Sequence, residues 1–181
     1  EDFFALNRLL SEHQVPYHFG DEWMMADMAS VEGSKIRVGR CVYDHVVIPA
    51  MDTLDDTTAA LLKQYLAAGG KLFLFGKAPT RINGRKADLS WLMGNCGFQE
   101  LRETSDIRIK KDGNNVPQLR QMTRKTRFGR LTFITNLSGD TLRDVRVSMR
   151  GAKQLRALDM NSLALREVPT ECGADGCTAR L

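Results

Sequence analysis

The chain contains no run of about 18 apolar residues, and its first residues lack the basic segment followed by an apolar run that marks a signal peptide. The sequence therefore predicts no membrane-spanning helix, and a membrane is not expected among its partners. The chain begins at Glu1, and EDFFALNRLLSEH already has the spacing of an amphipathic helix, with Phe3, Leu6, Leu9 and Leu10 on one face. We therefore expect it to begin within a domain.

Metal ligands are also scarce. The four cysteines, Cys41, Cys96, Cys172 and Cys177, form no CxxC pair, and all three histidines precede residue 46. A zinc site is therefore not expected, and no cofactor is predicted. The segment ECGADGC leaves two alternatives open, a small disulfide loop in an oxidising compartment or two free thiols near the end of the chain.

The net charge of +4 is unevenly distributed along the chain. Residues 1–79 hold 7 Lys/Arg and 11 Asp/Glu, whereas residues 80–181 hold 19 Lys/Arg and 11 Asp/Glu. This contrast predicts two domains. The cations of the second part are spread out with few aromatic residues between them, so nucleic acid is not expected as a partner. The basic segment RQMTRKTRFGR is interpreted as a solvated hairpin arm.

The most regular pattern runs from HVVIP through AMDTLDDTTAALLKQYLAAGG to KLFLFG. It predicts a strand, a helix with Asp55 as N-cap and Gly69 as left-handed terminator, and a second strand parallel to the first. Phosphate-binding glycines lie between a strand and the following helix, whereas Gly69 and Gly70 follow a helix and precede a strand. We therefore interpret them as a helix cap and a tight turn.

The remaining segments predict a change of architecture along the chain. VPYHFGDEW is expected to form a short strand, and a short helix is expected around Leu89 to Met93. Short alternating segments then follow, separated by turns: IRIKK, RLTFITNLS, DVRVSMRG, KQLRALDM and ALREVP. Regular short strands of this kind are typical of an antiparallel sandwich. The expected fold is α/β followed by all-β, with the boundary between about 95 and 105.

Two stretches resemble parts of large bacterial glycoside hydrolases. VPYHFGDEW followed by VYDHVVIPAMDTLDDTTAALLKQYLAAGGKLFLFGKAP resembles the class I glutamine-amidotransferase-like domain behind the catalytic barrel of β-galactosidases with a trimerisation domain and of α-L-rhamnosidase-like proteins. RLTFITNLSGDTLRDVRVSMRGAKQLRALDMNSLALREVP resembles the β-sandwich that follows there. The resemblance covers about residues 1–170. It implies a flavodoxin-like parallel sheet over 1–100, truncated at its N-terminus, and a small β-sandwich over 101–181.

The resemblance does not bring catalytic residues with it. An active amidotransferase needs a cysteine nucleophile at a strand-to-helix elbow and a downstream histidine and acid. Here KAP follows the strand that ends at Gly76, and Cys41 precedes a strand instead. In the hydrolases that the chain resembles, the catalytic acids belong to the upstream barrel. The resemblance therefore implies a non-catalytic accessory fragment whose partners are the upstream catalytic domain and further copies of itself. Its location follows the parent, periplasmic or extracellular if the parent is secreted and cytoplasmic otherwise.

A rival hypothesis is a free-standing module that binds a carbohydrate or a nucleotide at the carboxyl ends of the strands. Its candidate ligand-binding residues are Asp21, Glu22, Trp23 and Gly76. Glycoside hydrolysis would need two carboxyl groups about 5 to 10 Å apart across a sugar, whereas neighbours on a strand point to opposite faces. Asp21 and Glu22 could instead cap a helix. The Trp23 ring could stack on a sugar or pack in the core.

Overall fold

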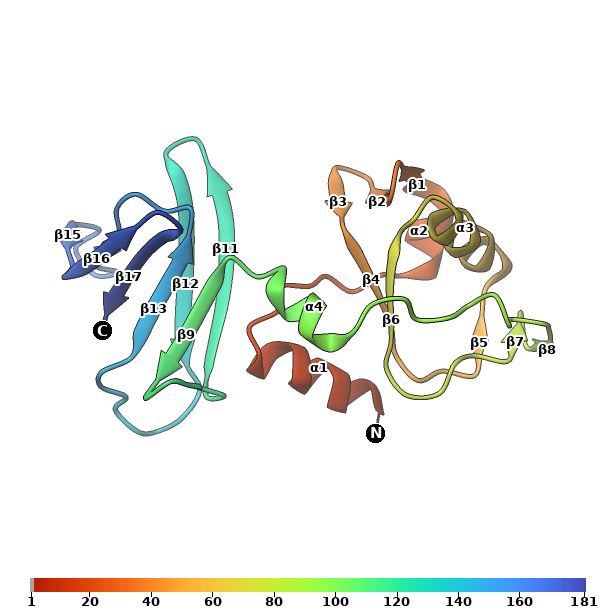
Figure 1. Cartoon of the computed structure of the whole chain (residues 1–181), viewed down its shortest axis with the longest axis horizontal. Coiled ribbons are helices and arrows are strands. Elements are labelled where there is room, and N and C mark those ends of the chain that lie inside the picture. The colour runs from red at the N-terminus through yellow and green to blue at the C-terminus, as the bar shows by residue number, and fades with distance from the viewer. Residues whose placement is uncertain (1) are drawn as a thin grey trace. The chain divides into compact units, whose positions relative to one another are not determined.

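The computed structural model describes residues 2–181 and shows a mixed α/β chain (Figure 1). Four helices and seventeen short strands lie in that range. The chain forms two compact units. The first contains the residues up to Arg8 together with Tyr17–Leu101, and the second contains Leu9–Pro16 and Arg102–Leu181. Helix α1 (Asp2–Glu12) was predicted from its apolar spacing, and its Leu6 and Leu10 are buried. None of the helices in residues 2–181 is long and apolar enough to span a membrane.

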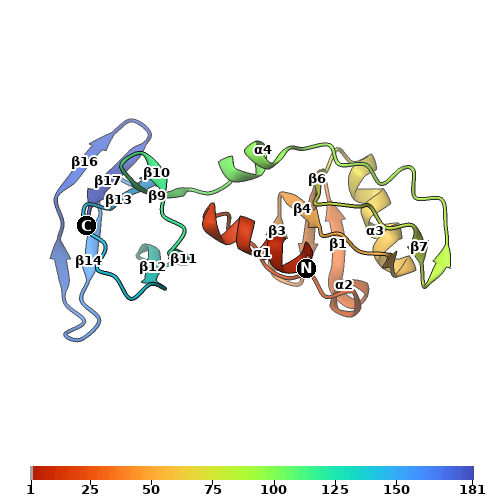
Figure 2. The ribbon, with the colours of Figure 1, turned by 90° about the horizontal axis from the view of Figure 1, so that it is seen from below.

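The first unit is built around a parallel pair of strands, β4 (His45–Ile48) and β6 (Lys71–Leu74), joined through helix α3 (Asp56–Ala67). The helix packs beside this pair (Figure 2) through a core that includes Ile48, Leu62 and Leu72. The unit also contains α2 (Glu22–Met28), the first part of α4 (Phe98–Glu103) up to Leu101, and two three-stranded sheets. These sheets are β1 (Ala29–Glu32), β2 (Lys35–Val38) and β3 (Cys41–Tyr43), and β5 (Thr53–Leu54), β7 (Arg81–Ile82) and β8 (Arg85–Lys86).

Tyr65 ties the end of α3 to the beginning of both parallel strands. Its side chain is fully buried, and its hydroxyl accepts a hydrogen bond from the Lys71 N–H at 2.8 Å. The same hydroxyl lies 2.9 Å from the Asp44 carbonyl oxygen and 2.8 Å from that of Lys71, either of which can accept its proton. Burial raises the pKa of Tyr65 to about 12, so the hydroxyl stays protonated and keeps its hydrogen bonds to the backbone.

The predicted strand, helix and parallel strand are confirmed at this point of the chain. Gly69 has a φ of +82°, the left-handed conformation expected of a helix terminator, and its N–H donates to the Leu66 carbonyl. Asp55 occupies the N-cap position, but its side chain makes no capping hydrogen bond.

Two predictions of local structure are wrong. The segment Val15 to Asp21 forms no strand, and a helix begins at Glu22 because the Asp21 carboxylate accepts the Met24 N–H at 2.9 Å as an N-cap. The segment around Leu89 to Met93 forms a turn instead of a helix. Just after it, Asn95 follows the edge of β6, where its side chain accepts the Leu72 N–H and donates to the Gly70 carbonyl. These two hydrogen bonds hold Asn95 beside the backbone of β6.

The second unit contains a five-stranded antiparallel sheet and a separate hairpin. The order in the sheet is β10 (Asn114–Asn115), β9 (Ile107–Lys111), β13 (Arg146–Arg150), β17 (Gly176–Arg180) and β16 (Thr170–Gly173). The hairpin is β11 (Leu119–Thr126) with β12 (Gly129–Asn136), and a small ribbon pairs β14 (Arg156–Leu158) with β15 (Leu165–Glu167). A core that includes Ile109, Leu119 and Val147 joins the sheet to the hairpin.

A glutamine completes the edge of this sheet beyond β10, whose pairing with β9 covers only Lys110 and Lys111. Gln14 follows α1 in a left-handed conformation, with a φ of +59°, and only 2% of it is exposed. Its side-chain amide donates to the Ile109 carbonyl at 3.0 Å, and its oxygen accepts the Ile109 N–H at 2.7 Å. Gln14 thus provides both hydrogen bonds that a neighbouring strand would provide to β9.

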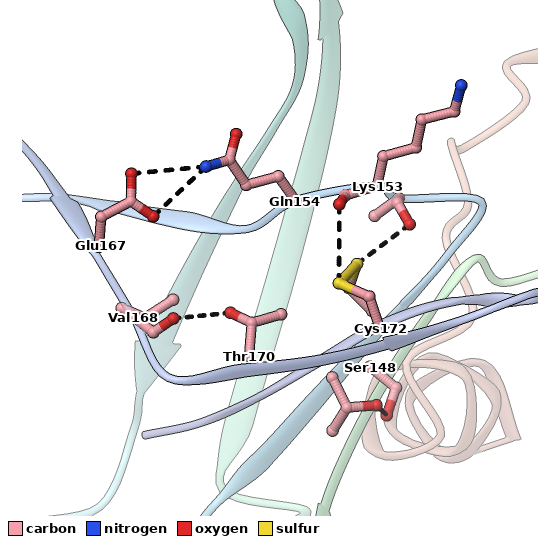
Figure 3. The surroundings of a disulfide bond; sticks show 10 residues. Ser148, Lys153, Gln154, Glu167, Val168, Thr170 and Cys172 are labelled. Carbon is pink, nitrogen blue, oxygen red and sulfur yellow. Dashed lines mark hydrogen bonds between the residues drawn. A yellow bond between two sulfur atoms is a disulfide. The ribbon is translucent and has the colours of Figure 1, made fainter.

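The two C-terminal cysteines form a disulfide, which was one of the two alternatives left open by the sequence. Cys172 and Cys177 face each other across the β16–β17 hairpin, with their Cα atoms 4.1 Å apart. Figure 3 shows the surroundings of this disulfide. The sulfur of Cys177 lies 3.1 Å from the Ala152 carbonyl oxygen, and Cys177 is buried. Structural disulfides of this kind persist in oxidising compartments.

Candidate functional site

The four predicted ligand-binding residues all lie in the first unit, but they have different surroundings. Asp21 is the N-cap of α2, Glu22 and Trp23 begin that helix, and Gly76 follows β6. Asp21 caps its own helix, as described above. The Glu22 side chain instead reaches α3, where its Oε1 accepts the Asp55 N–H at 2.9 Å. Both carboxylates are therefore engaged by backbone N–H groups.

The amino end of α3 is closed by side chains from elsewhere in the first unit. Beside Glu22, the Asn83 Oδ1 accepts the Asp56 N–H at 3.1 Å. In doubly wound folds, a phosphate group binds at the amino end of a helix that follows a parallel strand. At α3, the backbone N–H groups of Asp55 and Asp56 already donate to the Glu22 carboxylate and the Asn83 amide oxygen. An incoming phosphate would have to displace Asn83 and would be repelled by the negative charge of Glu22.

Gly76 and Trp23 differ in what surrounds them. Gly76 has a φ of +82°, and a Cβ added there would lie 3.0 Å from the Cβ of Ala50, which follows β4. The glycine therefore allows the segments after the two parallel strands to approach closely. Trp23 is 84% exposed, so its ring is available to a ligand, and the interpretation of a core residue does not apply to it.

The carboxyl groups with shifted pKa values are not suited to act as a general acid. A hydrogen bond from Arg37 lowers the pKa of Glu32, backbone N–H donation by Ser90 lowers the pKa of Asp88, and backbone N–H donation by Ser162 lowers the pKa of Asp159. A glycosidase acid needs a raised pKa to remain protonated until it donates to the leaving group. These three groups are shifted in the opposite direction. In residues 2–181, no group of three or more His, Cys, Asp and Glu side chains is placed to hold a metal ion.

A hollow on the five-stranded sheet was not predicted from the sequence. It has a volume of about 510 Å³ and contains a row of three cations, Lys110, Arg146 and Arg180, that face one another across β9, β13 and β17. Asp144 pairs with Arg180 at 2.6 Å, and Asp112 and Glu171 also line the hollow. Its acids and bases balance, so the hollow has no strong preference for a charged ligand. The alternation of side chains along each strand could have predicted that each cation lies on the outer face. Their proximity depends on the register of β9, β13 and β17, which the sequence does not show.

Comparisons of the chain with protein-family models, curated proteins and solved structures find no match. The resemblance to the accessory regions of glycoside hydrolases therefore remains a prediction, and the function has to be argued from the residues described above.

Proposed function

We propose that the chain is a non-catalytic accessory region of a bacterial glycoside hydrolase, supporting an upstream catalytic barrel or an oligomer in carbohydrate degradation. The observation that supports this most is the engagement of Asp21 and Glu22 by backbone N–H groups of α2 and α3. The only clustered carboxylates predicted to face a ligand hold two helices in place instead. A scaffold needs such contacts, whereas a hydrolase needs its acids directed at a substrate.

The proposal includes the finer fold. The first unit is proposed as a flavodoxin-like domain, because β4, α3 and β6 form a parallel strand–helix–strand element of the kind found in that fold. The second is proposed as a small antiparallel β-sandwich, because its sheet and hairpin share one core. The disulfide supports a periplasmic or extracellular location for the parent.

The alternative is a free-standing binding module with its site at the carboxyl ends of the parallel strands. The exposure of Trp23 favours a carbohydrate ligand for such a module, since an aromatic face suits the apolar face of a sugar ring. The Glu22 carboxylate at α3 disfavours a nucleotide.

The isolated chain is expected to hydrolyse no glycoside. The test is a panel of aryl glycosides, with rhamnosides and galactosides included, at high protein concentration. We expect release of the aryl group at the rate of buffer alone, because the Asp21 and Glu22 carboxylates accept backbone N–H groups instead of facing a substrate. Glu22→Gln and the matched variant Glu32→Gln, which alters a carboxylate paired with Arg37, provide the controls. Turnover that is lost in the first variant and kept in the second would contradict the proposal.

A further inference from the structure

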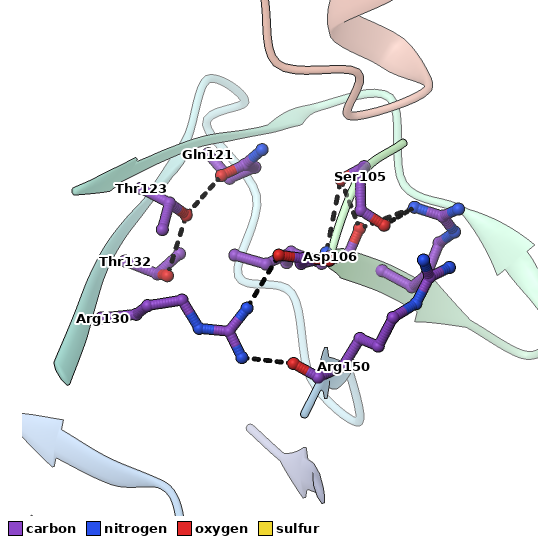
Figure 4. A network of polar contacts seen from close by, with 9 residues as sticks. Ser105, Asp106, Gln121, Thr123, Arg130, Thr132 and Arg150 are labelled. Atoms are coloured by element: carbon purple, nitrogen blue, oxygen red, sulfur yellow. Dashed lines mark hydrogen bonds and ion pairs between the residues drawn. The ribbon is translucent and has the colours of Figure 1, made fainter. Parts of the chain in front are cut away.

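The β11–β12 hairpin is fixed to the second unit through one face. Leu119 and Ile134 on that face belong to the core. The Thr123 hydroxyl lies 3.0 Å from that of Thr132, and Arg130 donates to Asp106 at 2.9 Å and to the Arg150 carbonyl (Figure 4). Side chains alternate along a strand, so the opposite face of the hairpin points away from this core.

That opposite face combines cations with apolar side chains, and we name it the hairpin track. Its residues are Arg120, Met122, Arg124, Leu131 and Phe133. Met122 faces Phe133 and Arg124 faces Leu131 across the two strands. Met122, Leu131 and Phe133 are 54%, 50% and 49% exposed. Three adjacent apolar side chains at half exposure, with an arginine beside them, form a patch of the kind found at binding surfaces.

The charged side chains of the segment that contains the hairpin are all cationic. Residues 113–139 contain Arg120, Arg124, Lys125, Arg127 and Arg130 but no Asp or Glu. Of these, Arg130 is paired with Asp106, and Arg120 donates to the carbonyls of Pro117 and Leu119. The side chains of Arg124 and Lys125 make no hydrogen bond or ion pair within residues 2–181. The hairpin therefore presents cations that lack a counter-charge of their own.

We propose that the hairpin track binds a linear polysaccharide that carries carboxylate groups. The choice of a carbohydrate rests on the proposed function, and the choice of an acidic one rests on the charge of the hairpin. At about 3.3 Å per residue, Arg120 and Arg124 lie about 13 Å apart along β11. The Arg124 guanidinium can pair with a carboxylate through two parallel hydrogen bonds, and the N–H groups of Arg120 that do not donate to Pro117 and Leu119 can bind a second carboxylate. Met122, Leu131 and Phe133 lie between and beside these cations and pack against the C–H faces of saturated sugar rings.

Other polyanions fit the track less well. Single-stranded nucleic acid stacks its successive bases on aromatic rings, whereas the track has one aromatic ring, Phe133, among aliphatic side chains. An anionic bilayer could reach Phe128 in the turn, which is 86% exposed, but Arg120 lies about 20 Å away from the turn end of its strand. A linear polymer laid along the hairpin contacts the whole track.

The test measures binding of the whole chain to polygalacturonate and to the same polymer with its carboxyl groups methyl-esterified. We expect polygalacturonate to bind and the ester to bind at least about tenfold more weakly. Arg124→Gln should weaken binding about tenfold, the loss expected for one charge-assisted pair, and Phe133→Ser should weaken binding to both polymers. Arg146→Gln, which removes a cation from the sheet instead, should change the affinity less than twofold. Thermal melts confirm that each variant is folded.

Several results would overturn the inference. Absence of polygalacturonate binding would do so, as would equal losses in Arg124→Gln and Arg146→Gln, which would indicate attraction by net charge alone. Equal or tighter binding of single-stranded DNA, of phosphatidylglycerol vesicles or of an acidic peptide would assign the track to that partner instead. Failure of the proposed function is distinguishable, because hydrolysis of aryl glycosides by the chain is measured without polygalacturonate.

Discussion

Gly70→Ala is expected to lower the free energy of unfolding by about 3 kcal/mol, through overpacking of a closed core. A Cβ at position 70 would lie 2.4 Å from ring atoms of Tyr65. That ring cannot withdraw without cost, because it is fully buried and its hydroxyl is hydrogen-bonded to Lys71.

Gly69→Ala is the matched control for this prediction. Gly69 has a φ of +82°, and an added Cβ would meet no atom within 4 Å. The variant should therefore lose only about 1 kcal/mol, from the left-handed conformation. Denaturant unfolding of both variants provides the comparison. If Gly69→Ala were the more destabilising of the two, the packing of Tyr65 against Gly70 would be wrong.

Gln14→Glu should have a comparable effect on the second unit, with a loss of about 3 kcal/mol at neutral pH. The substitution keeps the shape of the side chain but replaces the amide group that donates to the Ile109 carbonyl. It leaves that buried carbonyl without a donor and places a carboxylate where only 2% of the residue is exposed.

Gln118→Glu is the control, since Gln118 is exposed and the same charge is introduced. It should change the free energy of unfolding by less than about 0.5 kcal/mol. The measurement is the unfolding midpoint of each variant, together with hydrogen exchange at the Ile109 amide. Equal stability of the two variants, with the Ile109 amide still protected, would show that Gln14 does not complete the sheet edge.

The sequence predicted those parts of the fold that depend on nearby residues. The helix from Asp56 to Ala67, its end at Gly69 and the parallel partner strands follow from apolar spacing and from one glycine. The strand Ile107–Lys111 follows from alternation. Features that depend on distant partners were missed. Gln14 is 95 residues from Ile109. Asn95 bonds to Gly70 and Leu72, and local propensity cannot predict contacts over more than 20 residues.

The sequence named the candidate residues but did not indicate their contacts. Gly76 follows the carboxyl end of β6, and Glu22 links the start of α2 to the start of α3. The sequence allowed Asp21 to be a helix cap, but VPYHFGDEW was expected to form a strand, so no helix was predicted at Glu22. The contact of Glu22 with Asp55 spans 33 residues, and no pattern within a short window could indicate it. The hairpin track was missed because alternation alone does not show which strand pairs with which.

Under the proposed function, this chain works as part of a larger hydrolytic polypeptide. The most direct measurement is an immunoblot of the cells that produce it, with an antibody against residues 1–181, followed by a glycosidase assay of the immunoprecipitate. We expect the antibody to detect a polypeptide far larger than the 20.3 kDa of this chain, and we expect the precipitate to cleave an aryl glycoside that the isolated chain leaves intact. A band at 20.3 kDa without glycosidase activity would contradict the account and favour the free-standing binding module.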